Sequence, residues 1–204
     1  DILEGAINLF VQKNEGMRLG FKVHAEKTYQ YIQDYSYKKL AIYTVNSEEE
    51  LHSLEENFIH TKFNISKGFL YEFKLIKLKN GHGGFNITLH HLITDAWSIS
   101  LLVSEIIDIY SKLIKKEAIS EELNPSYIEY IESEENYLNS EKFKKDAQFW
   151  EDVFNRCPTC VSFSQKNSQD ISHEAKRKIF SLGNSEQINE FCKNNNISVF
   201  TFFM

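Results

Sequence analysis

The most informative stretch of the chain is residues 69–95, which read FLYEFKLIKLKNGHGGFNITLHHLITD. Residues 69–78 and 85–91 are rich in β-branched and aromatic residues, and this composition predicts two strands. The glycine-rich segment 79–84 leads from strand to strand, whereas a phosphate-binding loop leads from a strand into a helix. We therefore interpret the segment as the turn of an antiparallel hairpin.

Helices are expected on both sides of this hairpin. After Asp95 the apolar residues recur at three- and four-residue steps, which predicts a long helix with one buried stripe of Ile99, Leu102, Ile106, Ile109 and Leu113. Further helices are predicted for residues 2–13 and 48–60, for a polar stretch that ends at 139, for 141–154, and for a segment that begins at Ser185. Three further strands are predicted: one begins at Phe21, and the other two cover residues 40–45 and 178–182. This mixture favours an α/β sandwich, with helices packed on a mixed, largely antiparallel sheet, over a doubly wound parallel sheet.

Composition excludes several classes of function. The 204 residues carry a net charge of −6 and show no cluster of basic residues, so nucleic acid is not expected as a partner. No apolar run is long enough to span a membrane, and the first residues do not resemble a signal peptide. Three cysteines indicate reduced thiols and a cytoplasmic location. Cys157 and Cys160 form a CxxC without a second ligand pair, so no metal site is predicted.

Two adjacent histidines, His90 and His91, end the second strand of the hairpin, and Asp95 follows four residues after His91. Strand alternation places them on opposite faces: His91 with Phe85, Ile87 and Leu89, and His90 with Asn86 and Thr88. One histidine should then be chemical and the other structural. A neutral imidazole accepts a proton near neutral pH. Asp95 is expected to cap the following helix, and it could also pair with a cation.

The order of motifs along the chain resembles the amino-terminal lobe of a condensation domain from nonribosomal peptide synthetases, within the chloramphenicol acetyltransferase-like superfamily. The shared motif there is His-His-x-x-x-Asp-Gly, and this sequence has Ala96 where the glycine stands. The similar segments are residues 14–21, 95–98, 126–130, 149–150 and 201–204.

The resemblance implies a role for each motif residue. His91 would be the catalytic histidine and His90 its structural neighbour, while Asp95 would form an ion pair with Arg18 that fixes the loop around His91. Ala96 is expected to be tolerated in place of glycine. The implied reaction is attack by an amine on a thioester to give an amide, with His91 either as general base or as the group that orients the amine.

The resemblance also implies the partners. Phosphopantetheine arms of a donor and an acceptor carrier protein would deliver the substrates, next to an adenylation domain; no cofactor or metal would bind directly. Residues 1–183 would form the amino-terminal lobe and 184–204 the start of a second lobe. We expect the leading strand and the rest of that second lobe to be missing, and the chain to be inactive alone.

Three other functions stay open. They are acyl transfer from coenzyme A or to a soluble acceptor, epimerisation, and a non-catalytic role in docking carrier proteins. Cyclisation is less favoured, because that branch has aspartate in place of the first histidine, and here that residue is His90.

Overall fold

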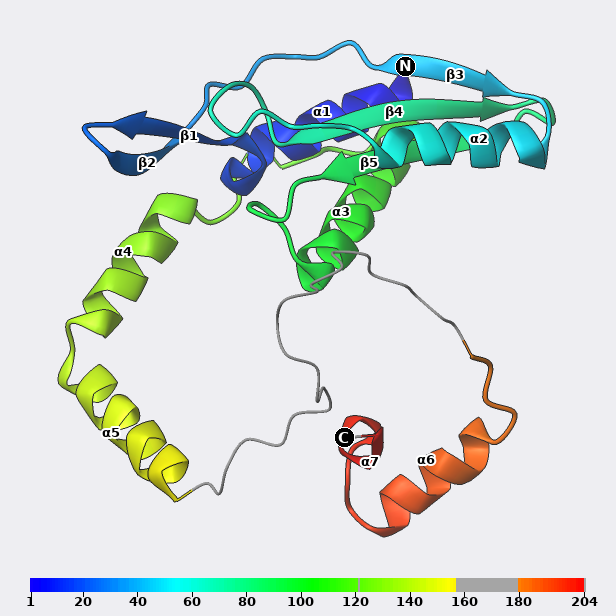
Figure 1. Ribbon diagram of the computed structural model, residues 1–204. Coiled ribbons are helices and arrows are strands. Elements are labelled where there is room, and N and C mark those ends of the chain that lie inside the picture. Colours follow the sequence, from blue (N-terminus) through cyan, green and yellow to red (C-terminus); the bar gives the residue numbers. More distant parts are fainter. Residues whose placement is uncertain (121, 157–179, 204) are drawn as a thin grey trace, which may run out of the picture. The chain divides into compact units, whose positions relative to one another are not determined.

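The structure of the protein is a computed structural model that describes residues 1–120, 122–156 and 180–203 (Figure 1). The chain divides into two compact units, Asp1–Asp152 and Val153–Met204, which are treated separately. The lobe boundary expected between residues 183 and 184 stays a prediction.

The predicted hairpin is present and forms the centre of the first unit. β4 (Tyr71–Leu78) and β5 (Gly83–Leu89) pair antiparallel from Tyr71 opposite Leu89 to Lys77 opposite Gly83. The Leu78 N–H donates to His82 O at 2.8 Å and closes the turn, in which Gly81 has a φ of +83°. β3 (Ala41–Val45) lies parallel to β4 on its other side, so the three-stranded sheet is mixed.

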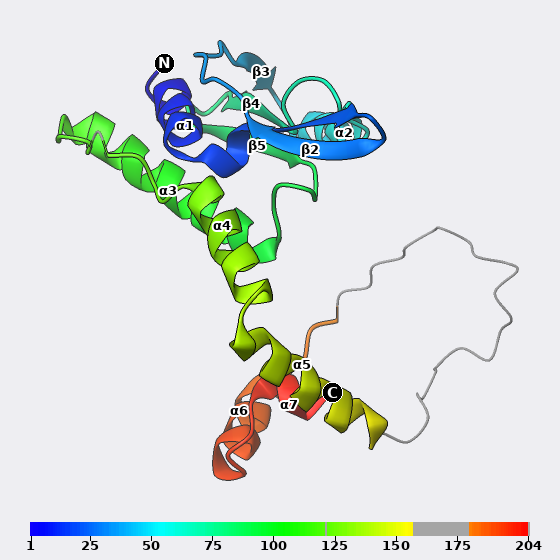
Figure 2. The same cartoon turned by 90° about the vertical axis from the view of Figure 1, so that its left-hand side faces the viewer.

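Two helices cover one face of this sheet and one helix covers the other. α1 (Ile2–Lys13) and α3 (Ala96–Lys115) lie together on one side in Figure 2, and α2 (Glu48–Ile59) lies on the opposite side. The core between α1, α3 and the sheet contains Ala6, Ile7, Phe10, Val11, Met17, Tyr71, Phe73, Leu75, Leu102, Ile106 and Ile109.

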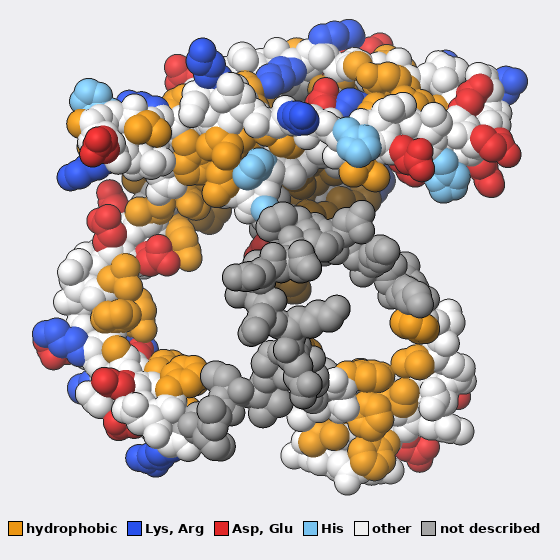
Figure 3. Space-filling model, in the orientation of Figure 1, with side chains coloured by type: hydrophobic (Ala, Val, Ile, Leu, Met, Phe, Trp, Pro, Cys, Tyr) orange, Lys and Arg blue, Asp and Glu red, His pale blue; other side chains and the backbone are white. Residues whose placement is uncertain are grey.

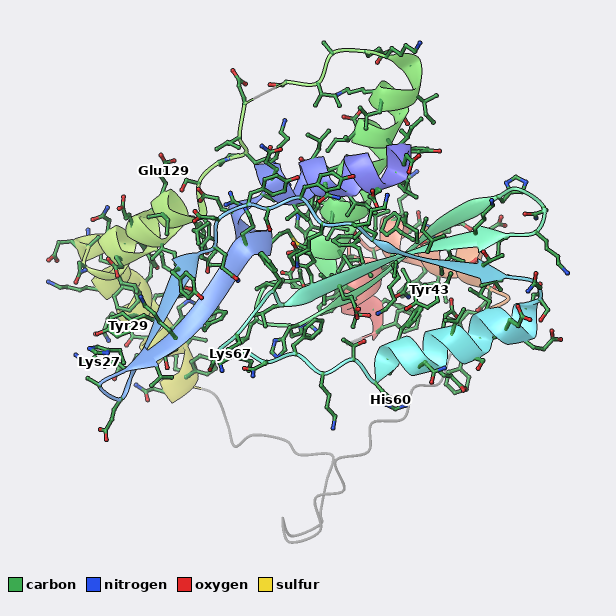
Figure 4. All side chains as sticks on the ribbon, turned by 90° about the horizontal axis from the view of Figure 1, so that it is seen from above. Lys27, Tyr29, Tyr43, His60, Lys67 and Glu129 are labelled. Atoms are coloured by element: carbon green, nitrogen blue, oxygen red, sulfur yellow. The ribbon has the colours of Figure 1, made fainter. Side chains whose placement is uncertain are left out.

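The α2 face is held by aromatic contacts. The rings of Tyr43 and Phe58 meet edge to face at 5.2 Å, and Figure 4 shows Tyr43 between β3 and α2. The Lys74 ammonium lies 4.3 Å from the centre of the Phe58 ring. The capping residue of α2 is Ser47, as predicted, since its hydroxyl accepts the Glu50 N–H at 3.2 Å.

A second, two-stranded sheet was only half predicted. A short 3₁₀ helix, η1 (Glu15–Arg18), leads into β1 (Leu19–His24), which pairs antiparallel with β2 (Lys27–Ile32). The turn between them uses Ala25 and Glu26, both with positive φ. Hairpin turns with positive φ are usually recognised in a sequence by glycine, asparagine or aspartate, because residues with a Cβ seldom adopt this backbone conformation. Alanine and glutamate at these positions therefore gave no indication of a turn.

The remaining helices leave apolar side chains exposed. α4 (Tyr127–Leu138) and α5 (Glu141–Asn155) follow the first five strands, and α6 (Ser185–Asn194) and α7 (Val199–Phe203) belong to the second unit. Figure 3 shows apolar side chains gathered over α6 and α7, where Phe200 is 73% exposed.

The strand predicted at residues 178–182 and two of the three cysteines lie wholly or partly outside the described residues. Of the strand expected at 178–182, residues 178 and 179 lie outside the described residues, and Phe180 to Leu182 are not in a strand. Cys157 and Cys160 also lie outside them, whereas Cys192 is buried. No helix within the described ranges has the length and apolar character needed to cross a membrane.

Candidate active site

The hairpin extends by one hydrogen bond beyond β5 and then turns sharply. The His90 N–H donates to Leu70 O at 2.9 Å, which continues the ladder, and His90 O then accepts the Ile93 N–H at 3.1 Å. Leu70 is fully buried, so this end of the hairpin is fixed in the interior. His91 therefore lies in a tight turn between the sheet and α3.

The predicted strand through His91 was two residues too long, because β5 ends at Leu89. Strand alternation does not continue into the turn, and it cannot by itself orient the two histidines. Phe85, Ile87 and Leu89 do pack against the core, as the alternation predicted for that part of the strand.

His90 is half-buried, and two contacts of its imidazole are seen among the described residues. Its Nδ1 accepts the Leu92 N–H at 3.1 Å, which requires a neutral ring with the proton on Nε2. The Phe63 ring meets it edge to face, with ring centres 6.2 Å apart. The two nitrogens of His90 are therefore not equally available to a substrate.

His91 has the opposite environment. Its side chain is exposed, and within the described residues it makes no hydrogen bond or ion pair. A neutral imidazole in this state has one nitrogen free to accept a proton and one N–H free to donate. Of the two histidines, His91 is the one that the geometry leaves accessible to a reacting group.

Asp95 caps α3, as the sequence predicted. Its Oδ1 accepts the Ser98 N–H at 2.7 Å and the Ser98 hydroxyl at 2.6 Å. These two bonds, the hydroxyl first, hold the pKa of Asp95 below its ordinary value. Ala96 is the first residue of α3 and is not among the described residues with positive φ, so its Cβ causes no backbone strain there.

The expected ion pair between Arg18 and Asp95 is not formed. Arg18 Nη1 donates to Gln33 O at 2.9 Å and Nη2 to Gln12 O at 3.4 Å, while its buried Nε has no partner among the described residues. Arg18 thus binds carbonyl groups at the ends of α1 and β2, and the Asp95 carboxylate is turned toward its own helix. The resemblance could not reveal this, since Asp95 bonds to Ser98 and Arg18 bonds to the carbonyl groups of Gln12 and Gln33.

Sequence reasoning missed the polar contacts of the segment before Arg18. Glu105 of α3 accepts from Asn14 Nδ2 at 3.3 Å and from Asn124 Nδ2 at 3.0 Å. Glu15 accepts from Ser126 Oγ at 2.8 Å and from Tyr127 N at 2.9 Å. The segment therefore ties α3 and the start of α4 to the end of α1.

A cavity of about 540 Å³ lies beside the histidine turn. Its walls come from the end of α1, η1, the first half of α3 and the loop before α4, and they include Met17, Ile93, Thr94, Ser98 and Leu102. Ile93 and Thr94 line it and His91 does not, so the cavity flanks the turn. Within the described ranges, no group of three metal-ligating side chains is present.

Comparison with known proteins identifies the family. A family model described as the condensation domain matches residues 1–204. Surfactin synthase subunit 1 from Bacillus subtilis (strain 168) is 28% identical over 99% of this chain, and a plipastatin synthase from the same organism is 29% identical over 100%. This chain spans only 6% of the surfactin synthase protein and 8% of the plipastatin synthase protein.

Solved structures agree on the fold. The condensation enzyme VibH superimposes with a TM-score of 0.75 and 18% identity, over 97% of this chain and 47% of that one. The epimerization domain of tyrocidine synthetase B gives a TM-score of 0.66 with 16% identity, over 78% and 38%. The fold is thus that of the chloramphenicol acetyltransferase-like enzymes, and the chain belongs to the condensation-domain family of nonribosomal peptide synthetases.

Proposed function

We propose that this chain supplies the histidine-bearing lobe of an enzyme that joins two carrier-bound substrates through an amide bond. The amine of the acceptor attacks the thioester carbonyl carbon of the donor. A C–N bond forms, the C–S bond breaks, and the thiol leaves with one proton. No metal or covalent enzyme intermediate is part of this proposal.

The observation that carries the proposal is the contrast between the two histidines. The His90 imidazole accepts a hydrogen bond from the Leu92 N–H. His91 is exposed, on a turn that is fixed to the buried Leu70 through the His90 N–H. A reacting amine needs an imidazole that is both unpaired and held in place. His91 meets both requirements, in a chain whose family is the condensation domain.

Two roles are open to His91 in this reaction. As a general base it takes the proton that the amine loses on forming the amide. As an orienting group it holds the amine and stabilises the charged tetrahedral intermediate. The pH dependence of kcat/KM separates them: a general base gives a rate that falls as the imidazole becomes protonated.

The substrates in this proposal arrive on the phosphopantetheine arms of a donor and an acceptor carrier protein. The relatives are large synthases of which this chain covers a small part, and neighbouring carrier and adenylation domains would fit that setting. We propose a cytoplasmic location for the same reason. Phosphopantetheine belongs to the carriers and needs no resident site here.

The test uses the intact condensation domain, because this chain spans about half the length of VibH. Amide formation is measured with loaded donor and acceptor carrier proteins for the wild type, His91→Ala and His82→Ala. His82 is an exposed histidine in the hairpin turn and is the matched control. We expect His91→Ala to lower turnover by about 10²-fold or more and His82→Ala to leave it unchanged.

Other outcomes would redirect the proposal. Inversion of a carrier-bound aminoacyl group without amide formation would assign epimerisation. Amide or ester formation with coenzyme A thioesters and soluble acceptors would assign the related acyl transfer. A folded domain that binds loaded carriers and makes no product would assign a docking role.

A further inference from the structure

We propose that Phe63 is a positioning residue for His91, because its ring holds the His90 imidazole against the Leu92 N–H and so fixes the turn that presents His91. The catalytic consequence rests on the proposed function. The structural half of the proposal, that Phe63 holds His90, can be tested on the chain alone.

The His90 side chain folds forward over its own turn. Its Nδ1 accepts from the N–H two residues later, and its backbone O accepts from the N–H three residues later. Local side-chain bonds of this kind close short rings that set the backbone direction. His91 lies inside both rings, so the orientation of the His90 imidazole determines where the His91 backbone points.

One hydrogen bond does not hold this imidazole by itself. A bond between two neutral groups contributes little once the water that it replaces is counted, and His90 is only half-buried. The edge-to-face contact with Phe63, at an interplanar angle of 76°, adds a second restraint on ring rotation. No other aromatic ring within the described residues contacts His90.

The segment that carries Phe63 is tied to its surroundings on both sides of this residue. It belongs to the segment that joins α2 to β4, in which Figure 4 labels His60 and Lys67 on either side of Phe63. Before Phe63, the Thr61 N–H donates to Phe58 O at 3.1 Å and its hydroxyl to Glu72 Oε2 at 3.4 Å. After it, Gly68 O accepts from Gln33 Nε2 at 3.2 Å.

The first experiment compares Phe63→Ala with Ile65→Ala in the 204-residue chain by ¹⁵N NMR of the histidine rings and by amide exchange. Ile65 is 42% exposed in the same segment and serves as the matched control. In the wild type and in Ile65→Ala we expect His90 Nδ1 to carry no proton. In Phe63→Ala we expect a mixture of the two neutral tautomers and severalfold faster exchange of the Leu92 amide.

A second variant protects the test against simple unfolding. In His90→Asn the amide oxygen can replace Nδ1 as acceptor, but no ring remains for Phe63 to contact. The Leu92 amide should keep its protection in His90→Asn, and adding Phe63→Ala should then have no further effect. Phe63→Leu keeps an apolar side chain and should still release His90 in the wild-type background.

The kinetic arm uses the intact domain with loaded carriers. Phe63→Ala should lower kcat by about tenfold or more and leave KM for both carriers unchanged, because His91 is misplaced while the carrier surfaces are intact. Unchanged His90 tautomer and Leu92 exchange in Phe63→Ala would overturn the proposal. Altered NMR with an unchanged kcat would overturn its positioning half. If the wild-type domain makes no amide, the proposed function fails, and the NMR comparison still decides whether Phe63 holds His90.

Discussion

Glu15 and Ser126 are 111 positions apart in the sequence and share a hydrogen bond of 2.8 Å from the serine hydroxyl to the glutamate Oε2. Ser126 is the N-cap of α4, and its Oγ also accepts the Ile128 N–H at 3.2 Å. The same Glu15 oxygen accepts the Tyr127 N–H. A carboxylate from η1 thus completes the capping of α4 and fixes where that helix begins.

Glu15→Ala should therefore loosen the first turn of α4. The loss of two hydrogen bonds at a helix N-terminus should lower the free energy of unfolding by about 1–2 kcal/mol. Denaturant unfolding measures the cost, and amide exchange at Tyr127 and Ile128 locates it. Glu129→Ala is the control, since Glu129 is an exposed residue in the first turn of α4 (Figure 4) and should change stability by less than about 0.5 kcal/mol. Equal effects of the two variants would contradict this role of Glu15.

The buried carboxylate of Glu4 should make stability depend on pH. Leu40 N donates to it at 2.8 Å and the Tyr37 hydroxyl at 2.8 Å, and the pKa of Glu4 is lowered, chiefly by the Leu40 N–H. The pKa of Glu4 in the folded protein lies below the ordinary value of 4.5. The ionised Glu4 carboxylate therefore stabilises the fold fully above pH 4.5, and this stabilisation is lost as the pH falls through the pKa of the folded state.

The variant Glu4→Gln tests whether the stabilisation by Glu4 is lost on acidification. The variant should be less stable than the wild type at about pH 7, and the gap between them should narrow as the pH falls toward about 3. Urea unfolding of both proteins across this range measures the gap. A gap that is constant or grows on acidification would show that the charge of Glu4 does not contribute.

The ion pair of Lys74 and Glu72 should respond unequally to loss of either partner. The Lys74 side chain is 7% exposed and that of Glu72 is 45% exposed. Glu72→Ala leaves a buried ammonium without its carboxylate, which should cost about 1–3 kcal/mol. Lys74→Met replaces the ammonium with an apolar group beside Phe58 and should stay within about 1 kcal/mol of the wild type. Thermal unfolding of the two variants gives the comparison, and the reverse order would refute it.

Two neighbouring glycines of the hairpin should tolerate alanine very differently. A Cβ at Gly83 would lie 2.6 Å from the backbone oxygen of Ile76, whereas a Cβ at Gly84 meets no atom within 4 Å. Gly83→Ala should push the strands apart and cost about 1–3 kcal/mol. Gly84→Ala should be neutral or slightly stabilising, because it restricts the unfolded chain. Denaturant midpoints of the two variants measure this, and a tolerated Gly83→Ala would mean that the strands can separate locally.

Much of the first unit could be predicted from local patterns. The glycine cluster between two β-rich runs marked the β4–β5 hairpin, and the three- and four-residue apolar spacing placed Leu102, Ile106 and Ile109 in the core. Ile99 of the same stripe lies in the first turn of α3 and is 40% exposed. Periodicity assigns a face, and only the packing decides how far along the helix that face is covered.

The contacts that define the site could not be predicted in the same way. Asp95 had a local signal for capping, and that prediction was confirmed. The predicted ion pair between Asp95 and Arg18 was wrong, because the Arg18 guanidinium donates to the carbonyl groups of Gln12 and Gln33 instead. The contact of Phe63 with His90 joins residues from different elements and leaves no spacing in the sequence that could reveal it.

The bond from His90 N to the carbonyl of Leu70 ties the histidine turn to a residue with no exposed surface. Moving the start of that turn would break this bond and leave the carbonyl group of a buried residue without its partner, which costs about 1–3 kcal/mol. The backbone at the start of the turn is therefore restrained by the interior of the lobe as well as by the His90 side chain. The position of His91 is thereby coupled to the packing of the core around Leu70.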